Sequence, residues 1–391
     1  MNAYRHRQVF AAACVGMLLF GIVLTTLGAV LPSIIQRLGL DRTEAGSLLA
    51  LMSLGILAGS LVFGPVVDRR GYKGMLATAV VLIALGLEGI AFAPSIALLA
   101  VSAIIIGLGG GVMNGGTNAL VADISAEGRA AGLAYLGVYF GIGAFGVPLV
   151  LGLLRERFGD AEVVAGIGML VALVLAYNAA IRFPEPKQPQ GFPLRQASGL
   201  LRDRVLVLLG VILFFESGIE ITVGGWTATY VNQELELPPE RALYLLSLYW
   251  LGMTGARLVL GWLLTRVSTV AVLLSSLGVA FAGALILIGA RTTASAGAGT
   301  LLAGAGFAAV FPVILGYVAD RHARLSGTAF GVVLVMALMG GTALPYVTGV
   351  LGDAIGLRPS LAIVPAGLIC VAGLFGITLP RLRRPRDDTS R

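Results

Sequence analysis

The chain has few of the residues that usually carry catalysis or metal binding. Among its 391 residues there are two histidines, His6 and His322, and two cysteines, Cys14 and Cys370. The histidines fall in expected loops or tails and the cysteines in apolar runs, so neither type has the spacing of a metal site or a disulfide framework. No nucleophile–base arrangement can be read either. We therefore expect no enzymatic activity, no metal and no cofactor.

Charged residues are also scarce. They make up 12% of the chain, against about 25% in soluble domains, whereas hydrophobic residues make up 57%. The net charge of +7 could suggest nucleic acid, but the basic residues stand at the ends of apolar segments and indicate topology instead. Glycine, at 55 residues, is abundant, as expected where helices pack closely within a bilayer. We therefore expect the protein to lie in a lipid bilayer and not to bind nucleic acid.

The sequence does contain apolar segments long enough to cross a membrane, which takes about 20 residues. The first apolar segment is too long for a cleaved signal peptide, and it has no small-residue cleavage site before Pro32. Twelve such spans are predicted, at residues 9–35, 44–66, 74–93, 96–122, 129–154, 162–182, 205–231, 241–264, 270–290, 294–319, 326–351 and 359–380.

The distribution of basic residues orients these spans. If both ends of the chain are cytoplasmic, 19 of the 27 Lys and Arg residues lie on the cytoplasmic side, as the positive-inside rule requires. A Pro-rich polar stretch separates six spans from six. We expect a multi-pass inner (plasma) membrane protein with an amino-terminal bundle at 1–182, a cytoplasmic linker at 183–204, and a carboxyl-terminal bundle with a short tail at 205–391.

The two halves repeat one another at an offset of 197 residues. Gly28 then meets Gly225, the run Val121-Ala122-Asp123 meets Val318-Ala319-Asp320, and Pro148 meets Pro345. Matches at one constant offset in five pairs of spans indicate a duplicated six-span unit. Parallel repeats of this kind are the plan of the major facilitator fold, in which the substrate sits near the midplane between the halves.

The loop between the second and third spans carries a motif. It reads Gly64-Pro-Val-Val-Asp68-Arg69-Arg70-Gly71-Tyr72-Lys73, which resembles the major facilitator signature G-x-x-x-D-R-x-G-R-[RK] with Tyr72 in place of a basic residue. Gly64 allows close helix contact and Gly71 a tight turn. Asp68 and Arg69 complete a group expected to latch the inner gate; a plain basic stop-transfer loop is the alternative.

Three further stretches resemble the fucose/glucose–proton symporter branch of that superfamily. The resembling residues are Asn118, Glu220 with Gly224-Gly225-Trp226, and Phe311-Pro312. The chain departs from the branch at Asn114, where several sugar–proton members have a carboxylate, and the span 9–35 holds no acid. If a proton is carried, its carrier must lie elsewhere.

Two acids stand within the span 205–231. Glu216 and Glu220 are one helical turn apart and share a face. An ionised group at the centre of a membrane helix costs about 2.5–3.5 kcal/mol, and two carboxylates so close in a low dielectric do not both stay ionised. We expect this pair to couple transport to protons, with sodium left open; a structural hydrogen bond to a neighbouring helix is the alternative.

Several uncharged residues are candidates for substrate binding. Amides suit neutral hydroxylated solutes, although an amide pair can also join two helices; aromatic rings can stack on a sugar, although aromatics are common at membrane interfaces. The candidates are Asn114, Asn118, Thr117, Trp226, Tyr139, Tyr249, Trp250 and Phe311.

Three charged residues are assigned to gating. Asp123 and Asp320 occupy equivalent positions at the cytoplasmic ends of their spans and are expected to act as gate or capping residues. Arg257 lies about one turn from the inner end of its span and is expected to snorkel or to pair with a loop acid such as Asp320.

These features together predict an all-α membrane protein of twelve helices in two pseudo-twofold-related six-helix bundles. Its expected function is alternating-access transport of a small solute by a monomer, with uptake of a neutral sugar or polyol driven by protons as the first hypothesis. Proton-driven export of drugs or metabolites, and a transporter-like receptor without flux, remain open alternatives.

Overall fold

The computed structural model describes residues 4–125, 129–185, 199–322 and 326–382. In these ranges the regular structure is helical, and twelve segments are long and apolar enough to cross a membrane, as predicted. The helices are α1 (His6–Leu38), α2 (Arg42–Phe92), α3 (Ile96–Ile124), α4 (Arg129–Leu154), α5 (Asp160–Ala180), α7 (Arg204–Glu234), α8 (Pro239–Leu264), α9 (Thr269–Ile288), α10 (Thr293–Phe307), α11 (Val310–Arg321), α12 (Ser326–Ile355), α13 (Leu357–Ser360) and α14 (Ile363–Leu382).

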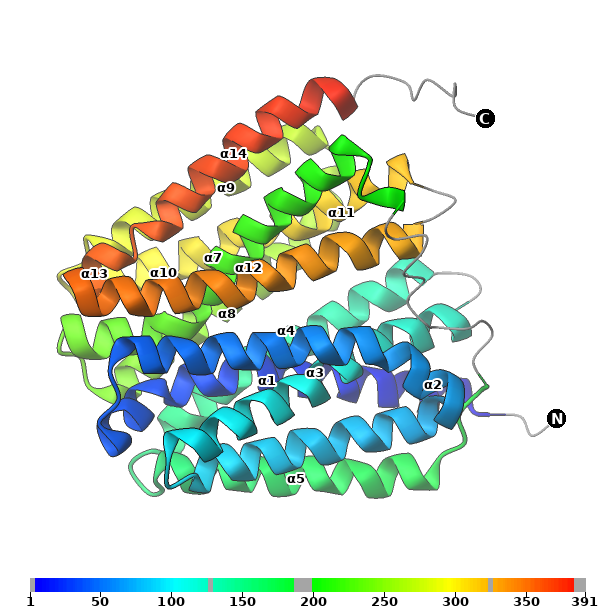
Figure 1. The fold of residues 1–391 in the computed structure, drawn as a ribbon, viewed down its shortest axis with the longest axis horizontal. Coiled ribbons are helices and arrows are strands. Elements are labelled where there is room, and N and C mark those ends of the chain that lie inside the picture. The colour runs from blue at the N-terminus through cyan, green and yellow to red at the C-terminus, as the bar shows by residue number, and fades with distance from the viewer. Residues whose placement is uncertain (1–3, 126–128, 186–198, 323–325, 383–391) are drawn as a thin grey trace.

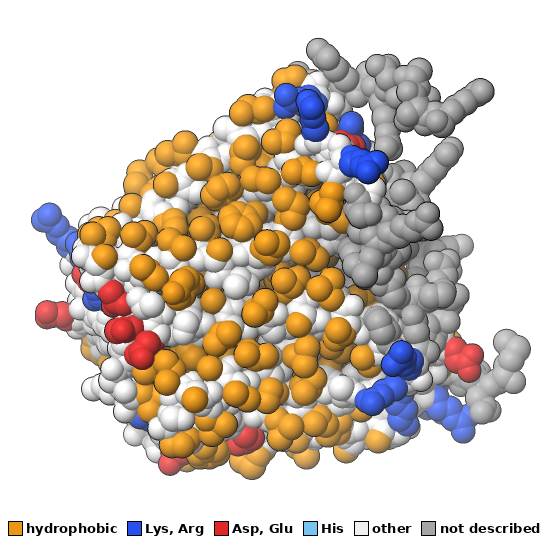
Figure 2. Space-filling view, in the orientation of Figure 1, with side chains coloured by type: hydrophobic (Ala, Val, Ile, Leu, Met, Phe, Trp, Pro, Cys, Tyr) orange, Lys and Arg blue, Asp and Glu red, His pale blue; other side chains and the backbone are white. Residues whose placement is uncertain are grey.

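Helices and membrane spans do not correspond one to one. Helix α2 contains two spans, Arg42–Gly64 and Arg69–Phe92, whereas α10 with α11, and α13 with α14, each make up a single span. Helices α1–α5 gather in one half of the molecule and α7–α14 in the other, with both chain ends at the same end of the long helices (Figure 1). Hydrophobic side chains cover the middle of the face in Figure 2, and Lys and Arg gather at the end where the termini lie.

The break within α2 falls on Gly71. Its backbone has φ +65° and ψ 176°, a conformation that is essentially restricted to glycine. A Cβ at this position would meet nothing within 4 Å, so the backbone conformation and not crowding requires glycine. The expected turn at Gly71 is thus present in the structure.

The span formed by α10 and α11 is interrupted just before Phe311-Pro312. Helix α10 ends at Phe307 and α11 starts at Val310. Pro312 has no N–H, so it cannot bond to the carbonyl of Ala308 four residues earlier. The proline therefore accounts for the break.

Glycine lets the two halves approach at the α1–α7 contact. A Cβ on Gly28 would lie 2.7 Å from the carbonyl oxygen of Gly224 and 2.9 Å from the Cα of Gly225. Gly28 and Gly225 are also equivalent positions of the sequence repeat. The two repeat copies therefore touch each other at matching residues, as an axis of pseudo-symmetry between them requires.

Two further seams join the halves, one between α2 and α12 and the other between α4 and α8. In the first, a Cβ on Gly46 would lie 3.1 Å from the carbonyl oxygen of Pro345. In the second, a Cβ on Gly152 would lie 2.6 Å from the ring of Tyr244. The repeat offset pairs α2 with α8 and α4 with α12, so the two seams occupy equivalent places.

Candidate functional site

Glu216 and Glu220 lie at adjacent turns of α7. Glu216 is fully buried at 0% exposure, and neither of its carboxylate oxygens has a hydrogen-bond donor among the described residues. Its charge interacts with that of Glu220, one turn further along the same face of α7. Because ionised carboxylates only accept hydrogen bonds, a bond between the two forms only when one of them carries a proton.

Arg257 of α8 belongs to the same cluster. Its charge interacts with both Glu216 and Glu220, and its guanidinium stands 5.9 Å from the ring centre of Phe140 on α4. Asp320, the alternative partner, is exposed at the far end of α11. The structure thus turns Arg257 towards the interior, whereas the sequence led us to expect a residue that snorkels towards the inner surface.

An aromatic group surrounds these charges. Trp250 packs edge-on against Phe140 at 6.0 Å and against Tyr249 at 5.1 Å between ring centres. The hydroxyl of Tyr249 donates to the backbone oxygen of Glu220 at 3.3 Å, and Phe20 of α1 lies 5.5 Å from Phe140. The cluster therefore draws on both halves of the molecule: α1 and α4 from one, α7 and α8 from the other.

Two polar groups of the cluster lack partners within the described ranges. The indole N–H of Trp250 has no acceptor, and Glu216 has no donor. Leaving a buried polar group unsatisfied costs about 1–3 kcal/mol, and more for a charged one, so each such group in a native protein calls for an explanation. A hydroxylated solute or a water could accept from the indole and donate to the carboxylate, whereas a proton would satisfy the carboxylate alone.

The amide pair lies on α3, and its contacts are local apart from one between the Asn118 nitrogen and the sulfur of Met17 on α1, at 4.0 Å. The Asn118 side-chain nitrogen donates to the backbone oxygen and the side-chain oxygen of Asn114, at 2.8 and 3.1 Å. Thr117 is buried and its hydroxyl donates to the Met113 backbone oxygen at 2.8 Å. The two amides are half-buried, so they keep some surface open, whereas Thr117 packs against Gly16 of α1.

The other aromatic candidates lie apart from the charged cluster. Trp226 is fully buried, and its indole N–H donates to the Pro345 backbone oxygen at 3.0 Å, which fastens α7 to α12. Tyr139 is half-buried beside Phe140, the residue that makes the contact across the halves. Phe311 is half-buried at the start of α11.

The expected inner gate lies near the end that holds the termini. Asp123 accepts a hydrogen bond from the Tyr72 hydroxyl at 2.6 Å, so the residue that departs from the loop signature has a partner on α3. Gly64 is buried and Arg69 exposed. The side chain of Asp68 is not among those the structure describes.

Sequence reasoning missed a group of polar residues at the opposite end. Arg42 and Thr43 at the start of α2 bind Glu234 of α7 and Asp353 of α12. The pattern Asp41-x-x-Glu44 marks a helix start, and both arms of this capping box are formed. This local pattern does not reveal that the same helix start also binds Asp353, more than 300 residues away.

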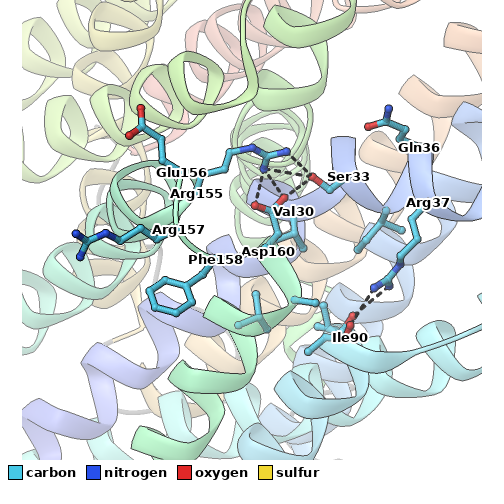
Figure 3. A pocket seen from close by; sticks show the side chains of 15 residues that line it. Val30, Ser33, Gln36, Arg37, Ile90, Arg155, Glu156, Arg157, Phe158 and Asp160 are labelled. Atoms are coloured by element: carbon cyan, nitrogen blue, oxygen red, sulfur yellow. Dashed lines mark hydrogen bonds and ion pairs between the residues drawn. The ribbon is translucent and has the colours of Figure 1, made fainter.

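A separate cavity of about 530 Å³ opens at this same end, within the first half. Figure 3 shows Arg155 bonded to Asp160 and Ser33 on one side, and Arg37 bonded to the Ile90 backbone on the other. These side chains bind one another, and the cavity lies away from the α7–α8 cluster. We interpret it as a space between helix ends.

Twelve spans, two equivalent halves in contact, and a charged cluster of one half packed against aromatic rings of the other define a solute carrier of the bilayer. The sequence matches the model of the Major Facilitator Superfamily over residues 13–343. The chain belongs to that superfamily. It is therefore a transporter and not an enzyme, with a membrane and a small-molecule substrate as its partners, and the predicted all-α transporter fold is confirmed.

The chain shares limited sequence identity with proteins of stated function. The chain is 22% identical to sodium-dependent glucose transporter 1A of Mus musculus, over 88% of this chain and 89% of the relative. It is 26% identical to a gallate transporter of Pseudomonas putida, over 66% of this chain and 58% of the relative. A crystal structure of the nucleoside transporter NupG (D323A mutant) superposes with a TM-score of 0.81 at 16% identity, covering 95% of this chain and 99% of the other.

Proposed function

We propose that the protein takes up a neutral sugar or polyol together with a proton, by alternating access of a site between its halves. The observation that carries the proposal is the cluster of Glu216, Glu220 and Arg257, in which Glu216 is fully buried and the two acids share one face of α7. A relative named as a sodium-dependent glucose transporter, matched over 89% of its length, supports a sugar as the substrate and leaves the coupling ion to the test below.

In this proposal the acid pair is the proton carrier. Two carboxylates beside one guanidinium are balanced by a single added proton, so the cluster is neutral when protonated and has one excess negative charge when it is not. The cluster then binds a proton from whichever side of the membrane it is open to. It releases the proton on the other side once the protein has changed conformation. One elementary charge moved through 100 mV is worth about 2.3 kcal/mol, enough to drive accumulation of a neutral solute.

In this proposal the substrate binds beside the cluster. The unsatisfied indole N–H of Trp250 offers a donor and Glu216 offers acceptors, which are the partners that a hydroxylated solute needs. The rings of Trp250 and Phe140 offer apolar faces for a sugar. The half-buried amides Asn114 and Asn118 supply neutral donors and acceptors from the first half.

A second candidate is proton-coupled uptake of an aromatic carboxylate. The guanidinium of Arg257 beside the Phe140 ring is a site that fits an anionic aromatic solute, and a relative named as a gallate transporter supports that class. In this candidate, protonation of the two acids releases Arg257 to bind the carboxylate of the solute. Sugar uptake needs no such release.

The first prediction tests the proton carrier in proteoliposomes with an imposed pH gradient. Glu220→Gln and Glu216→Gln each remove a titrating carboxyl while keeping its size. We expect uptake of labelled hexose driven by the pH gradient to fall at least tenfold in each, with exchange of hexose between the two sides less affected, because exchange needs no net proton movement. Glu88→Gln is the matched control, because Glu88 packs against Gly168 of α5, away from the cluster.

Other outcomes of the same assay decide between the alternatives. Uptake of hydroxybenzoates, lost in both Arg257→Lys and Arg257→Gln, would favour the carboxylate candidate. Flux that follows a sodium gradient and ignores the pH gradient would overturn proton coupling. Drug efflux without sugar flux would favour export, and binding without flux under either gradient would favour a receptor.

A further inference from the structure

The first turn of α2 is capped by a residue from the other half of the molecule. A carboxylate oxygen of Asp353 accepts from the backbone N–H of Arg42 at 2.9 Å, and the other accepts from the N–H and the hydroxyl of Thr43 at 2.7 and 2.6 Å. The first N–H groups of a helix have no partner inside the helix. Asp41 takes only that of Glu44, so the cap is complete only while α12 is docked on α2.

The contact is reciprocal. The Arg42 side chain donates to the backbone oxygen of Gly352 at 2.7 Å, near the carboxyl end of α12, and to Glu234 at the end of α7 at 3.3 Å. An acid thus faces the amino end of one helix and a base faces the carboxyl end of the other, the arrangement that both helix dipoles favour. A Cβ on Gly349 would collide with the backbone oxygen of Arg42, so the backbones themselves touch.

Among the residues that the structure describes, the equivalent seam between α4 and α8 has no counterpart of this contact. At the repeat offset, Pro239 and Glu240 of α8 replace Arg42 and Thr43, and Glu156 replaces Asp353. Pro239 has no N–H to donate, and Glu240 and Glu156 are both acids, so when ionised neither can donate to the other. Within the described part of the chain, every hydrogen bond between the halves at this end involves Arg42 or Thr43.

We propose that Asp353, with Arg42 and Glu234, is a one-sided lock that holds this end of the transport path closed. Opening here requires Asp353 to leave the α2 amino end and Arg42 to leave Glu234 and the Gly352 carbonyl. The α4–α8 seam has no equivalent bonds to break, so it parts first while the α2–α12 seam still holds. Asp353 acts through the position of α2 and has no contact with the charged cluster.

Distances between spin labels test the lock without any substrate. In a background of Cys14→Ala and Cys370→Ala, paired labels at Gln36, near the end of α1, and Ala354 of α12 report on the separation of the halves at this end, and labels at Arg157 and Arg241 report on the α4–α8 side. We expect Asp353→Ala to raise the long-distance fraction at this end about fivefold, the effect of losing one helix cap. Asp353→Asn, whose amide oxygen still accepts, should have a smaller effect.

Glu156→Ala, the repeat-related acid with no bond across the halves, is the matched control and should leave both distributions unchanged. An unchanged distribution in Asp353→Ala, or an equal shift in Glu156→Ala, would overturn the proposal. If Asp353→Ala does not fold, Thr43→Val removes one donor at nearly constant shape and should shift the same distances in the same direction. Neither result depends on proton coupling or on the identity of the solute, so the lock and the proposed function fail separately.

Discussion

At position 71 the backbone conformation alone determines which amino acids can be accommodated without strain. Its φ of +65° and ψ of 176° strain every residue with a Cβ, at a cost of about 1–3 kcal/mol. We expect Gly71→Ala to lower the free energy of unfolding by that amount, read as a lower melting temperature of the detergent-purified protein. Gly137→Ala is the control, because Gly137 lies inside α4 with open space around it and alanine favours a helix by about 0.5–1 kcal/mol.

At the same scale, the sequence identified the acids of the cluster but not their neighbours. Two glutamates within an apolar span stand out in any reading. Successive residues of α4 point about 100° apart around the helix axis, so only one of Tyr139 and Phe140 can meet the cluster. The neighbouring residues are apolar on both sides of α4, so the sequence does not determine which of the two it is. The partners of Arg257 depend on how α8 is rotated about its axis relative to α7, and this rotation cannot be predicted from the sequence.

Between elements, Asp203 joins the start of α7 to the end of α11. It accepts from the backbone N–H of Val205 at 2.8 Å and from the side chain of Arg321 at 3.1 Å, with His322 at 3.3 Å. Burial alone raises the pKa of Asp203, but the bonds from Arg321 and Val205 and the charges of Arg321 and His322 outweigh it. The pKa therefore lies below its ordinary value.

A pH-dependent stability follows from that direction. A carboxyl whose pKa is lowered on folding contributes its full stability above the pKa of the unfolded chain, about 3.9, and loses it as the pH falls. We expect Asp203→Asn, which can still cap α7, to cost about 0.5–1 kcal/mol at pH 7, the range of a partly exposed ion pair. The difference in melting temperature from the unmodified protein should shrink below about pH 4, and a difference independent of pH would contradict this.

The spans themselves were the most predictable elements. Twelve apolar runs of sufficient length were read from composition, and twelve are present in the described residues. The breaks at Gly71 and before Pro312 follow from the two residues with the strongest backbone preferences. What could not be read is which ends bind across the halves, because Arg42 and Asp353 are joined only once the whole bundle has formed.

At the scale of the whole molecule, both chain ends lie on one side (Figure 1). The excess of Lys and Arg in the loops of that side leads us to propose that it faces the cytoplasm of the inner membrane. We expect a fluorescent protein fused after Arg391 to fluoresce in cells, and alkaline phosphatase at the same place to be inactive. Phosphatase fused after Arg157 should be active, because that loop lies at the opposite end.

Under the proposed proton coupling, the number of charges in the cluster of Glu216, Glu220 and Arg257 has a consequence for how the protein responds to voltage. Two acids and one guanidinium sum to zero once a single proton is bound, so a membrane potential exerts no net pull on the loaded cluster as it turns from one face to the other. The empty cluster, with one excess negative charge, is the form on which the potential acts. Hyperpolarisation should therefore hasten the return of the unloaded carrier and leave the loaded step nearly untouched.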